Sequence, residues 1–204
     1  NGIENENVKL LVRAAQALRE VPWLPLGSHS TLHGIDWEVI GFMRRSTTSE
    51  GTQYPWSEYL LFNVQQGFAW LIEYQGHWNF ARTLSSPPPV SRGQAKFKRD
   101  GQEFKLFNTG KAEVTYVVGE FYWRVVVGET CAVDDYVCPP LMLSREVTDK
   151  EASWSQAEYL EPAELCAAFR IQAPPPKRIG VYANQPNPLT ERHRRVCRLF
   201  WQLA

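Results

Sequence analysis

Several ionisable side chains of this chain stand among aromatic residues, where acid–base chemistry is conceivable. Two carboxylates that flank a cleft can act as general acid and base, and a nearby histidine can relay a proton. His77 lies four residues after Glu73, so the residue types allow a hydrolase that uses His77 with Glu73 or Glu120. The full set of polar residues in aromatic surroundings is Glu58, Glu73, His77, Glu120, Asp134, Asp135 and Glu146.

A structural role for these residues is the simpler interpretation. Carboxylates on strands commonly face solvent or pair with cations, here Arg124 and Lys105. Asp134 and Asp135 are adjacent, so on a strand they would point to opposite sides and chelate a metal poorly. The sequence contains no nucleophile elbow, no phosphate-binding glycine loop and no zincin helix. It therefore names no reaction, and we expect no catalytic residue, no metal and no cofactor.

Composition restricts the class of partner. The 204 residues carry no net charge, whereas a nucleic-acid-binding protein normally has a basic face. Ten Phe, eight Trp and eight Tyr residues can fill a core. Any aromatic cluster left exposed would suit a protein partner, because Trp and Tyr act as anchors in interfaces. We expect a protein partner and no nucleic acid, with a candidate functional surface made of Glu73, His77, Trp78, Glu120, Trp123 and Asp135.

The cysteines indicate a reducing compartment. They form no C-x-x-C pair, and no histidine follows them at the spacing of zinc ligands. Isolated cysteines in a chain of this size are typical of buried thiols rather than of disulfides. The four residues are Cys131, Cys138, Cys166 and Cys197.

Local patterns predict a chain that is mainly β. Apolar residues at three- and four-residue steps favour a helix over 6–20. Alternation favours strands over 35–43, 57–63 and 68–74, and a further strand that begins at 77–80. In the first strand one face would consist of Ile35, Trp37, Val39 and Met43. Four residues, ending in Gly67, separate the second and third strands, which is hairpin length.

The second half of the chain continues this pattern after a run of prolines. Strands are predicted over 103–108, 113–118 and 121–127, with turns marked by Gly119 and Gly128. The extended stretch 137–146 contains two consecutive prolines, so we expect a sheet edge or a bulge there. Residues 161–169 are predicted to form a short helix with Pro162 in the first turn.

These elements predict an antiparallel β core, either a small barrel or a sandwich, with short flanking helices at both ends. We expect an N-terminal helix and linker over 1–23 and a β-rich domain over 24–172, whose two halves would separate near 85–95. A proline-rich linker over 173–189 and a basic helix over 190–204 would follow.

The C-terminal segment suggests a membrane. Four arginines precede a short apolar, aromatic run, as is typical where a cytoplasmic segment meets a bilayer. We expect the chain to be a soluble piece of a longer protein, with a membrane helix after Ala204. The alternative is an ordinary amphipathic helix packed on its own domain. The arginines are Arg192, Arg194, Arg195 and Arg198.

An ordered set of short motifs resembles a known family. The motifs are Leu26-Gly27, Gly34, Val39-Ile40-Gly41, Trp56-Ser57-Glu58-Tyr59, Trp70-Leu71, Gly76-His77-Trp78, Gly119-Glu120-Phe121-Tyr122-Trp123, Pro139-Pro140, Glu146 and Glu158-Tyr159-Leu160. Over about residues 24–169 they resemble the bacterial family called Domain of Unknown Function 4178. The resemblance implies a membrane-tethered, mostly β module, in a family whose members often carry zinc-ribbon modules and in some cases are encoded near envelope-stress genes. It implies no catalytic residues.

Together these observations favour a non-catalytic protein-interaction domain on the cytoplasmic side of a bacterial inner membrane, with a role in envelope stress. The alternatives are the hydrolase around Glu73, His77 and Glu120, and a sensor that binds a small molecule between the two halves.

Overall fold

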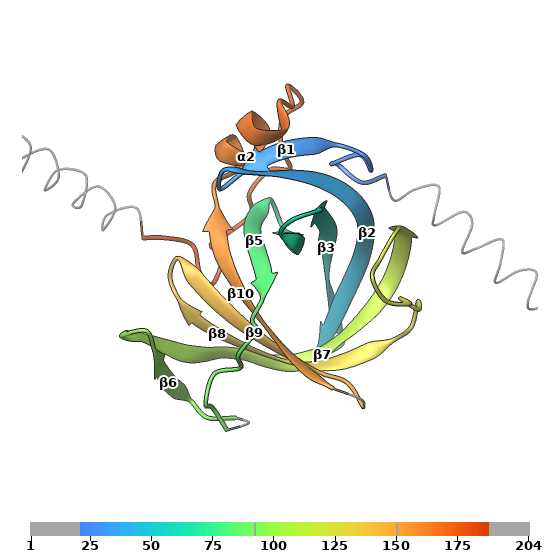
Figure 1. The fold of residues 1–204 in the computed structure, drawn as a ribbon. Helices are drawn as coiled ribbons and strands as arrows, with labels where there is room; N and C mark the ends of the chain where they lie inside the picture. The colour runs from blue at the N-terminus through green and yellow to red at the C-terminus, as the bar shows by residue number, and fades with distance from the viewer. Residues whose placement is uncertain (1–20, 92, 150, 188–204) are drawn as a thin grey trace, which may run out of the picture.

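Eight antiparallel strands form a closed barrel in this protein. The computed structural model describes residues 21–91, 93–149 and 151–187. The ring closes because β2 pairs with β3 on one side and with β7 on the other (Figure 1). In order around the ring the strands are β2 (Ile35–Ser49), β3 (Thr52–Asn63), β4 (Gly67–Tyr74), β5 (His77–Thr83), β10 (Ala152–Leu160), β9 (Leu141–Val147), β8 (Thr130–Cys138) and β7 (Gln102–Gly119). The predicted mainly β, antiparallel fold is confirmed, as a barrel.

Two short strands and one helix of the described chain add to the ring. β1 (His29–Leu32) pairs with β2, β6 (Lys96–Arg99) pairs with β7, and α2 (Pro162–Phe169) contacts β1. The helix predicted at the C-terminal end of the β domain is confirmed as α2. Pro162 lies in its first turn, where the backbone N–H that proline lacks has no partner within the helix. Residues 84–95 connect β5 to β6, and strands from both sides of this connection belong to the same barrel.

Three predictions differ from the structure. The strands predicted over 103–108 and 113–118 are parts of one continuous strand, β7. Residues 121–127 are not a strand but part of the loop between β7 and β8, in which aromatic rings pack on β4 instead of joining a ladder. The stretch 137–146 is not one extended edge. It consists of the end of β8, a turn at Pro139 and Pro140, and the start of β9, because consecutive prolines cannot donate ladder hydrogen bonds.

The inner face of the barrel is identified by a contact that crosses it. Arg45 on β2 reaches Glu146 on β9, although β7 and β8 lie between these strands. Residues that share the face of Arg45 therefore point into the barrel, as alternate residues of barrel strands do. The strand registers place on this face Trp56, Glu58, Trp70, Ile72, His77, Asn79, Ala81, Ala157, Tyr159, Met142, Val137 and Asp135.

A bulge in β2 gives Arg45 its inward direction. The β2–β3 register shifts between Val39 and Gly41, so one residue of β2 has no partner there. Trp37 and Val39 lie on the outer face before the bulge, whereas Met43 lies on the inner face after it. The predicted single face for Trp37, Val39 and Met43 is therefore wrong, because an extra residue reverses the alternation.

The largest apolar cluster lies against the outer face of β2–β5. Trp78 pairs with Glu73 on β4, on the face opposite to His77, and it has no exposed surface. Three leucines cover this face: Leu24, which precedes β1, Leu32 of β1 and Leu165 of α2. Burial of so much aromatic and aliphatic surface is the main stabilising term of the fold. It also explains why a strand face that would be exposed in a bare barrel is apolar here.

The N-terminal helix predicted over 6–20 and the basic segment 190–204 lie outside the described residues. In the part of the chain that is described, no helix has both the length and the apolar character needed to cross a bilayer.

Candidate functional site

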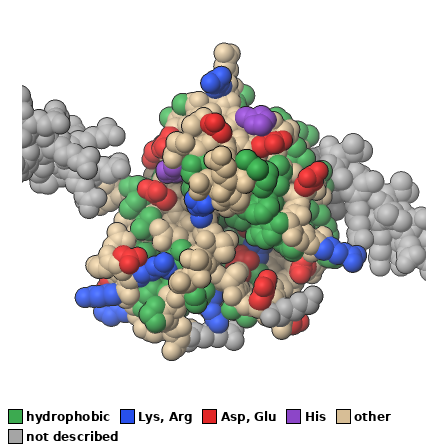
Figure 2. Space-filling model, in the orientation of Figure 1, with side chains coloured by type: hydrophobic (Ala, Val, Ile, Leu, Met, Phe, Trp, Pro, Cys, Tyr) green, Lys and Arg blue, Asp and Glu red, His purple; other side chains and the backbone are tan. Residues whose placement is uncertain are grey.

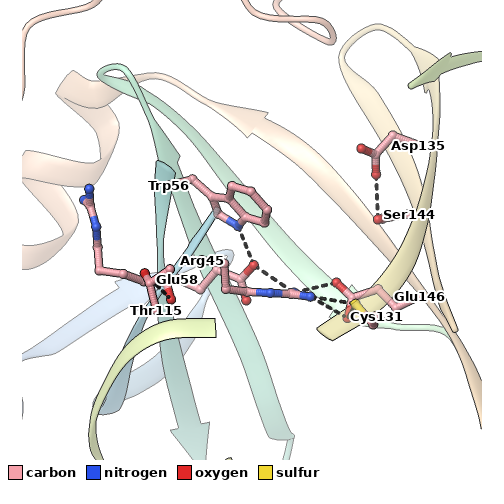
Figure 3. A network of polar contacts seen from close by, with 9 residues as sticks. Arg45, Trp56, Glu58, Thr115, Cys131, Asp135, Ser144 and Glu146 are labelled. Atoms are coloured by element: carbon pink, nitrogen blue, oxygen red, sulfur yellow. Dashed lines mark hydrogen bonds and ion pairs between the residues drawn. The ribbon is translucent and has the colours of Figure 1, made fainter. Parts of the chain in front are cut away.

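A network of charged side chains occupies the inside of the barrel (Figure 3). The Arg45 guanidinium donates to Glu146 through both terminal nitrogens, at 2.6 Å and 3.3 Å, and to Glu58 Oε1 at 3.1 Å. Trp56 Nε1 donates to the same Glu58 oxygen at 2.6 Å, and Arg45 Nη2 lies 2.8 Å from Cys131 Sγ. One buried cation is thus shared by two carboxylates from opposite sides of the ring.

The burial of this network changes its acid–base properties. Burial raises the pKa of Glu58, and the nearby Arg45 opposes this rise. Burial, followed by the Glu146 charge, raises the pKa of the Cys131 thiol to about 12. Cys131 is therefore a neutral thiol at physiological pH, and a neutral thiol is a poor nucleophile. These effects favour a structural role for the network.

Asp135 is a third carboxylate on the inner face, after Glu58 and Glu146. Ser144 Oγ donates to it at 2.6 Å across the β8–β9 pair. Burial raises the pKa of Asp135 to about 6, while hydrogen bonds from Ser144 and Asn108 act in the opposite direction. The prediction that Asp135 belongs to an exposed functional surface is wrong, because the register of β8 turns it inward.

His77 is also buried, and both of its ring nitrogens have partners. Nε2 lies 3.3 Å from the carbonyl oxygen of Ile179, which can only accept, so Nε2 carries the proton. Nδ1 then accepts from the Tyr159 hydroxyl at 2.9 Å. With 1 % of its surface exposed, His77 cannot contact a partner, and the same holds for the fully buried Trp78.

The predicted hydrolase residues do not converge. Glu73 lies on the outer face and accepts the backbone N–H of Gly76 at 2.7 Å, which closes the β4–β5 turn. His77 lies on the inner face, and exposed Glu120 starts the β7–β8 loop, where its N–H donates to Ile40. A general acid and base must meet at one substrate atom, so this arrangement does not provide the proposed chemistry.

The loop of residues 120–129, here called the mouth loop, covers one end of the barrel. Phe121 and Trp123 contact the inner-face ring of Trp70 at 6.2 Å and 5.7 Å between centroids, and Tyr122 contacts Phe68 at 4.4 Å. Gly41 makes room for the loop, because a Cβ at this position would lie 2.5 Å from the carbonyl oxygen of Glu120.

Four apolar side chains of the mouth loop are exposed and form what we call the mouth patch. Their exposed fractions are 53 % for Tyr122, 38 % for Trp123, 46 % for Val126 and 43 % for Val127. Figure 2 shows hydrophobic side chains gathered near the centre of the face that Figure 1 views. Of the predicted surface residues, Trp123 and Glu120 belong to the mouth loop and are exposed.

Two surface hollows lie elsewhere on the outer face. One of about 350 Å³ lies between β1 and α2, and one of about 320 Å³ lies over Phe80. His33, at the β1–β2 turn, borders both. In the described residues, no group of three or more His, Cys, Asp or Glu side chains is placed to hold a metal ion. Neither hollow is lined by residues of the charged network.

Sequence reasoning identified Glu58 and Glu146 as polar residues in apolar surroundings but missed their partner, Arg45. A charged residue within the apolar run of β3 signals a buried ion that needs a counter-ion. The identity of that counter-ion depends on the closure of the ring.

Of the comparisons with known proteins, the one with family models finds a match for this chain. A family model described as "Domain of unknown function (DUF4178)" matches residues 25–162. No curated protein and no solved structure matches the chain. The matched residues include the charged network, the mouth loop and all the strands of the barrel.

Proposed function

Because this chain belongs to the DUF4178 family, as its motifs indicated, and the family's description assigns no activity, we propose a function from geometry alone. The barrel is a non-catalytic protein-interaction domain whose mouth patch binds a protein partner. The observation that carries this proposal is the exposure of Tyr122 and Trp123 beside Val126 and Val127.

The conformation of the mouth loop favours a mode of binding in which its aromatic side chains insert into a pocket of the partner. Tyr122 and Trp123 are exposed, yet their rings rest on Phe68 and Trp70 of β4, which limits the freedom they lose on binding. Large aromatic side chains held in this way are typical anchors of interfaces. The barrel would then act as a rigid support for the loop, with its charged network fixing the spacing of the strands beneath.

The charges around the loop indicate the chemistry of the partner. Glu120 and Glu129 lie exposed at its two ends, and exposed Arg124 lies between them. A partner with an apolar pocket and a basic rim complements this arrangement. Phosphate backbones do not complement it, because the acidic ends of the loop and the zero net charge of the chain would repel or fail to attract them.

Substitution of the anchors tests this proposal. The double substitution Tyr122→Ala and Trp123→Ala is expected to reduce recovery of a specific partner by more than about tenfold, since interface anchors contribute about 2 kcal/mol or more each. Affinity purification from native membranes and cytosol, followed by quantitative mass spectrometry, measures the recovery. Phe107→Ala is the matched control, because Phe107 is 61 % exposed on β7 and outside the mouth loop. Equal recovery by all three chains, or no partner with any of them, contradicts the proposal.

We further propose that the domain works beside the cytoplasmic face of a bacterial inner membrane, within an envelope-stress assembly. The support is the sequence of the basic segment, in which four arginines precede Leu199, Phe200 and Trp201. Arginines near an anionic leaflet contribute about 1 kcal/mol each to binding.

Vesicle binding tests this placement. The chain is expected to float with vesicles that contain anionic lipid and to lose most of this binding at high salt. A variant with four Arg→Gln substitutions should not float, and the residues to change are Arg192, Arg194, Arg195 and Arg198. Equal flotation with neutral vesicles, or unchanged flotation of the variant, would argue against an electrostatic membrane contact.

A further inference from the structure

The end of the barrel opposite the mouth loop is closed by the chain's own residues 177–185, here called the strap. The strap lies at the β4–β5 turn, whereas the mouth loop lies at the other end of β4. Its backbone forms directed contacts with the barrel. Ile179 N–H donates to the Gln75 carbonyl at 3.0 Å, and the Ile179 carbonyl accepts from His77 Nε2 at 3.3 Å.

Two side chains anchor the strap to the inner face. The Tyr182 ring stacks on His77, with centroids 5.7 Å apart, and packs against the cluster that contains Ala81 and Met142. Asn184 is fully buried, and its Nδ2 donates to Asn79 Oδ1 at 2.7 Å and to the Pro140 carbonyl at 2.8 Å. Both anchors therefore meet side chains and carbonyls that already point toward this end of the barrel.

The other side of the strap faces solvent. Val181 is 87 % exposed and Ile179 is 61 % exposed, whereas the next three residues, Tyr182, Ala183 and Asn184, pack on the barrel. The strap turns at these residues, since the Gln185 N–H donates to the Tyr182 carbonyl at 3.0 Å. Close approach of the backbone depends on Gly76, where a Cβ would lie 2.5 Å from the carbonyl carbon of Lys177. Buried side-chain anchors combined with main-chain hydrogen bonds are features by which proteins recognise peptides.

The barrel residues that form this site and the strap that occupies it differ in their relation to the family match. The barrel residues that contact the strap all lie within the matched range 25–162, whereas the strap begins after it. Between α2 and the strap runs a connection with three consecutive prolines, and Gln172, Ala173 and Pro174 are exposed. The binding site thus lies within the matched range, and the segment that fills it lies after that range, beyond an exposed connection.

From these contacts we propose that this end of the barrel is a recognition site for a peptide that turns at an aromatic residue followed two positions later by asparagine. The strap is its resident and exchangeable occupant, and the site accepts the same sequence in trans. This inference is independent of the proposed role of the mouth patch, since the two surfaces lie at opposite ends of the barrel.

The test uses the full chain with a protease site inserted between Gln172 and Ala173. After cleavage and dilution, the barrel is expected to keep its far-ultraviolet circular dichroism and to bind a labelled peptide of residues 175–187 with one-to-one stoichiometry, measured by fluorescence anisotropy. Peptides with Tyr182→Ala or Asn184→Ala should bind at least about tenfold more weakly. The matched control peptide, Val181→Ala, should bind like the original, because Val181 faces solvent.

Three results would overturn the proposal. Loss of the β signal when the cleaved strap dissociates would mean that the strap is an inseparable part of the fold. A strap that an excess of free peptide never displaces would not be exchangeable. Equal binding of the Tyr182→Ala and Val181→Ala peptides would show that no aromatic recognition takes place.

Discussion

Replacement of Arg45 by methionine is expected to lower the free energy of unfolding by about 3–5 kcal/mol, the usual effect of removing one partner from a buried ion pair. Methionine retains much of the side-chain volume, so the loss is mainly electrostatic. Glu58 and Glu146 would keep their positions without the cation to which they bind at 3.1 Å and 2.6 Å. Urea unfolding, followed by tryptophan fluorescence at pH 7, measures the change.

Two further variants separate this effect from ordinary loss of a charge. Lys96→Met breaks the pair between Lys96 and Glu103, which is largely exposed, and should change stability by less than about 1 kcal/mol. The triple variant Arg45→Met, Glu58→Gln, Glu146→Gln removes the uncompensated charges and should recover part of the loss. If Arg45→Met alone changed stability no more than Lys96→Met does, the network would not be a stabilising element of the barrel.

Local features of the fold could be predicted from the sequence because neighbouring residues determine them. Gly67 marks a hairpin turn and Pro162 marks the start of α2, since each has a backbone preference that acts at its own position. Residues 121–127 show the limit of this logic. Their composition suits a strand, but packing of Tyr122 and Trp123 on β4 determines their conformation.

The candidate sites were harder to predict because they depend on ring closure. Arg45 and Glu146 are 101 residues apart, and a single bulge decides whether Arg45 faces inward. The pairing of Glu73 with Trp78 likewise places His77 on the opposite face from Glu73, a fact that proximity in sequence conceals. The exposed aromatic cluster expected for a protein partner exists, with Trp123 in it, but Trp78 packs in the outer core. Periodicity gives alternation along one strand, but not the position of a bulge or the identity of the strand across the ring.

Asp135→Asn is expected to make the protein more stable at neutral pH and to leave it nearly unchanged near pH 4. Burial raises the pKa of Asp135 in the folded chain from 3.8 to about 6. The folded state therefore holds this proton more tightly than the unfolded state does. Its contribution to stability is greatest below pH 3.8 and is lost as the pH rises through 6. A shift of this size corresponds to roughly 3 kcal/mol.

Asparagine removes this dependence because it resembles the protonated acid and cannot ionise. Its side-chain oxygen can still accept from Ser144, whose hydroxyl lies 2.6 Å from the carboxylate in the parent chain. Urea unfolding of both proteins from pH 4 to pH 8 gives the difference in stability, in which the titration of all other groups largely cancels. The exposed Asp149, changed to asparagine, is the matched control and should give a difference that stays small over this range. A variant that is less stable than the parent at pH 7.5 would mean that the barrel stabilises the charged form of Asp135, and hence that a cation or donor on its inner face outweighs burial.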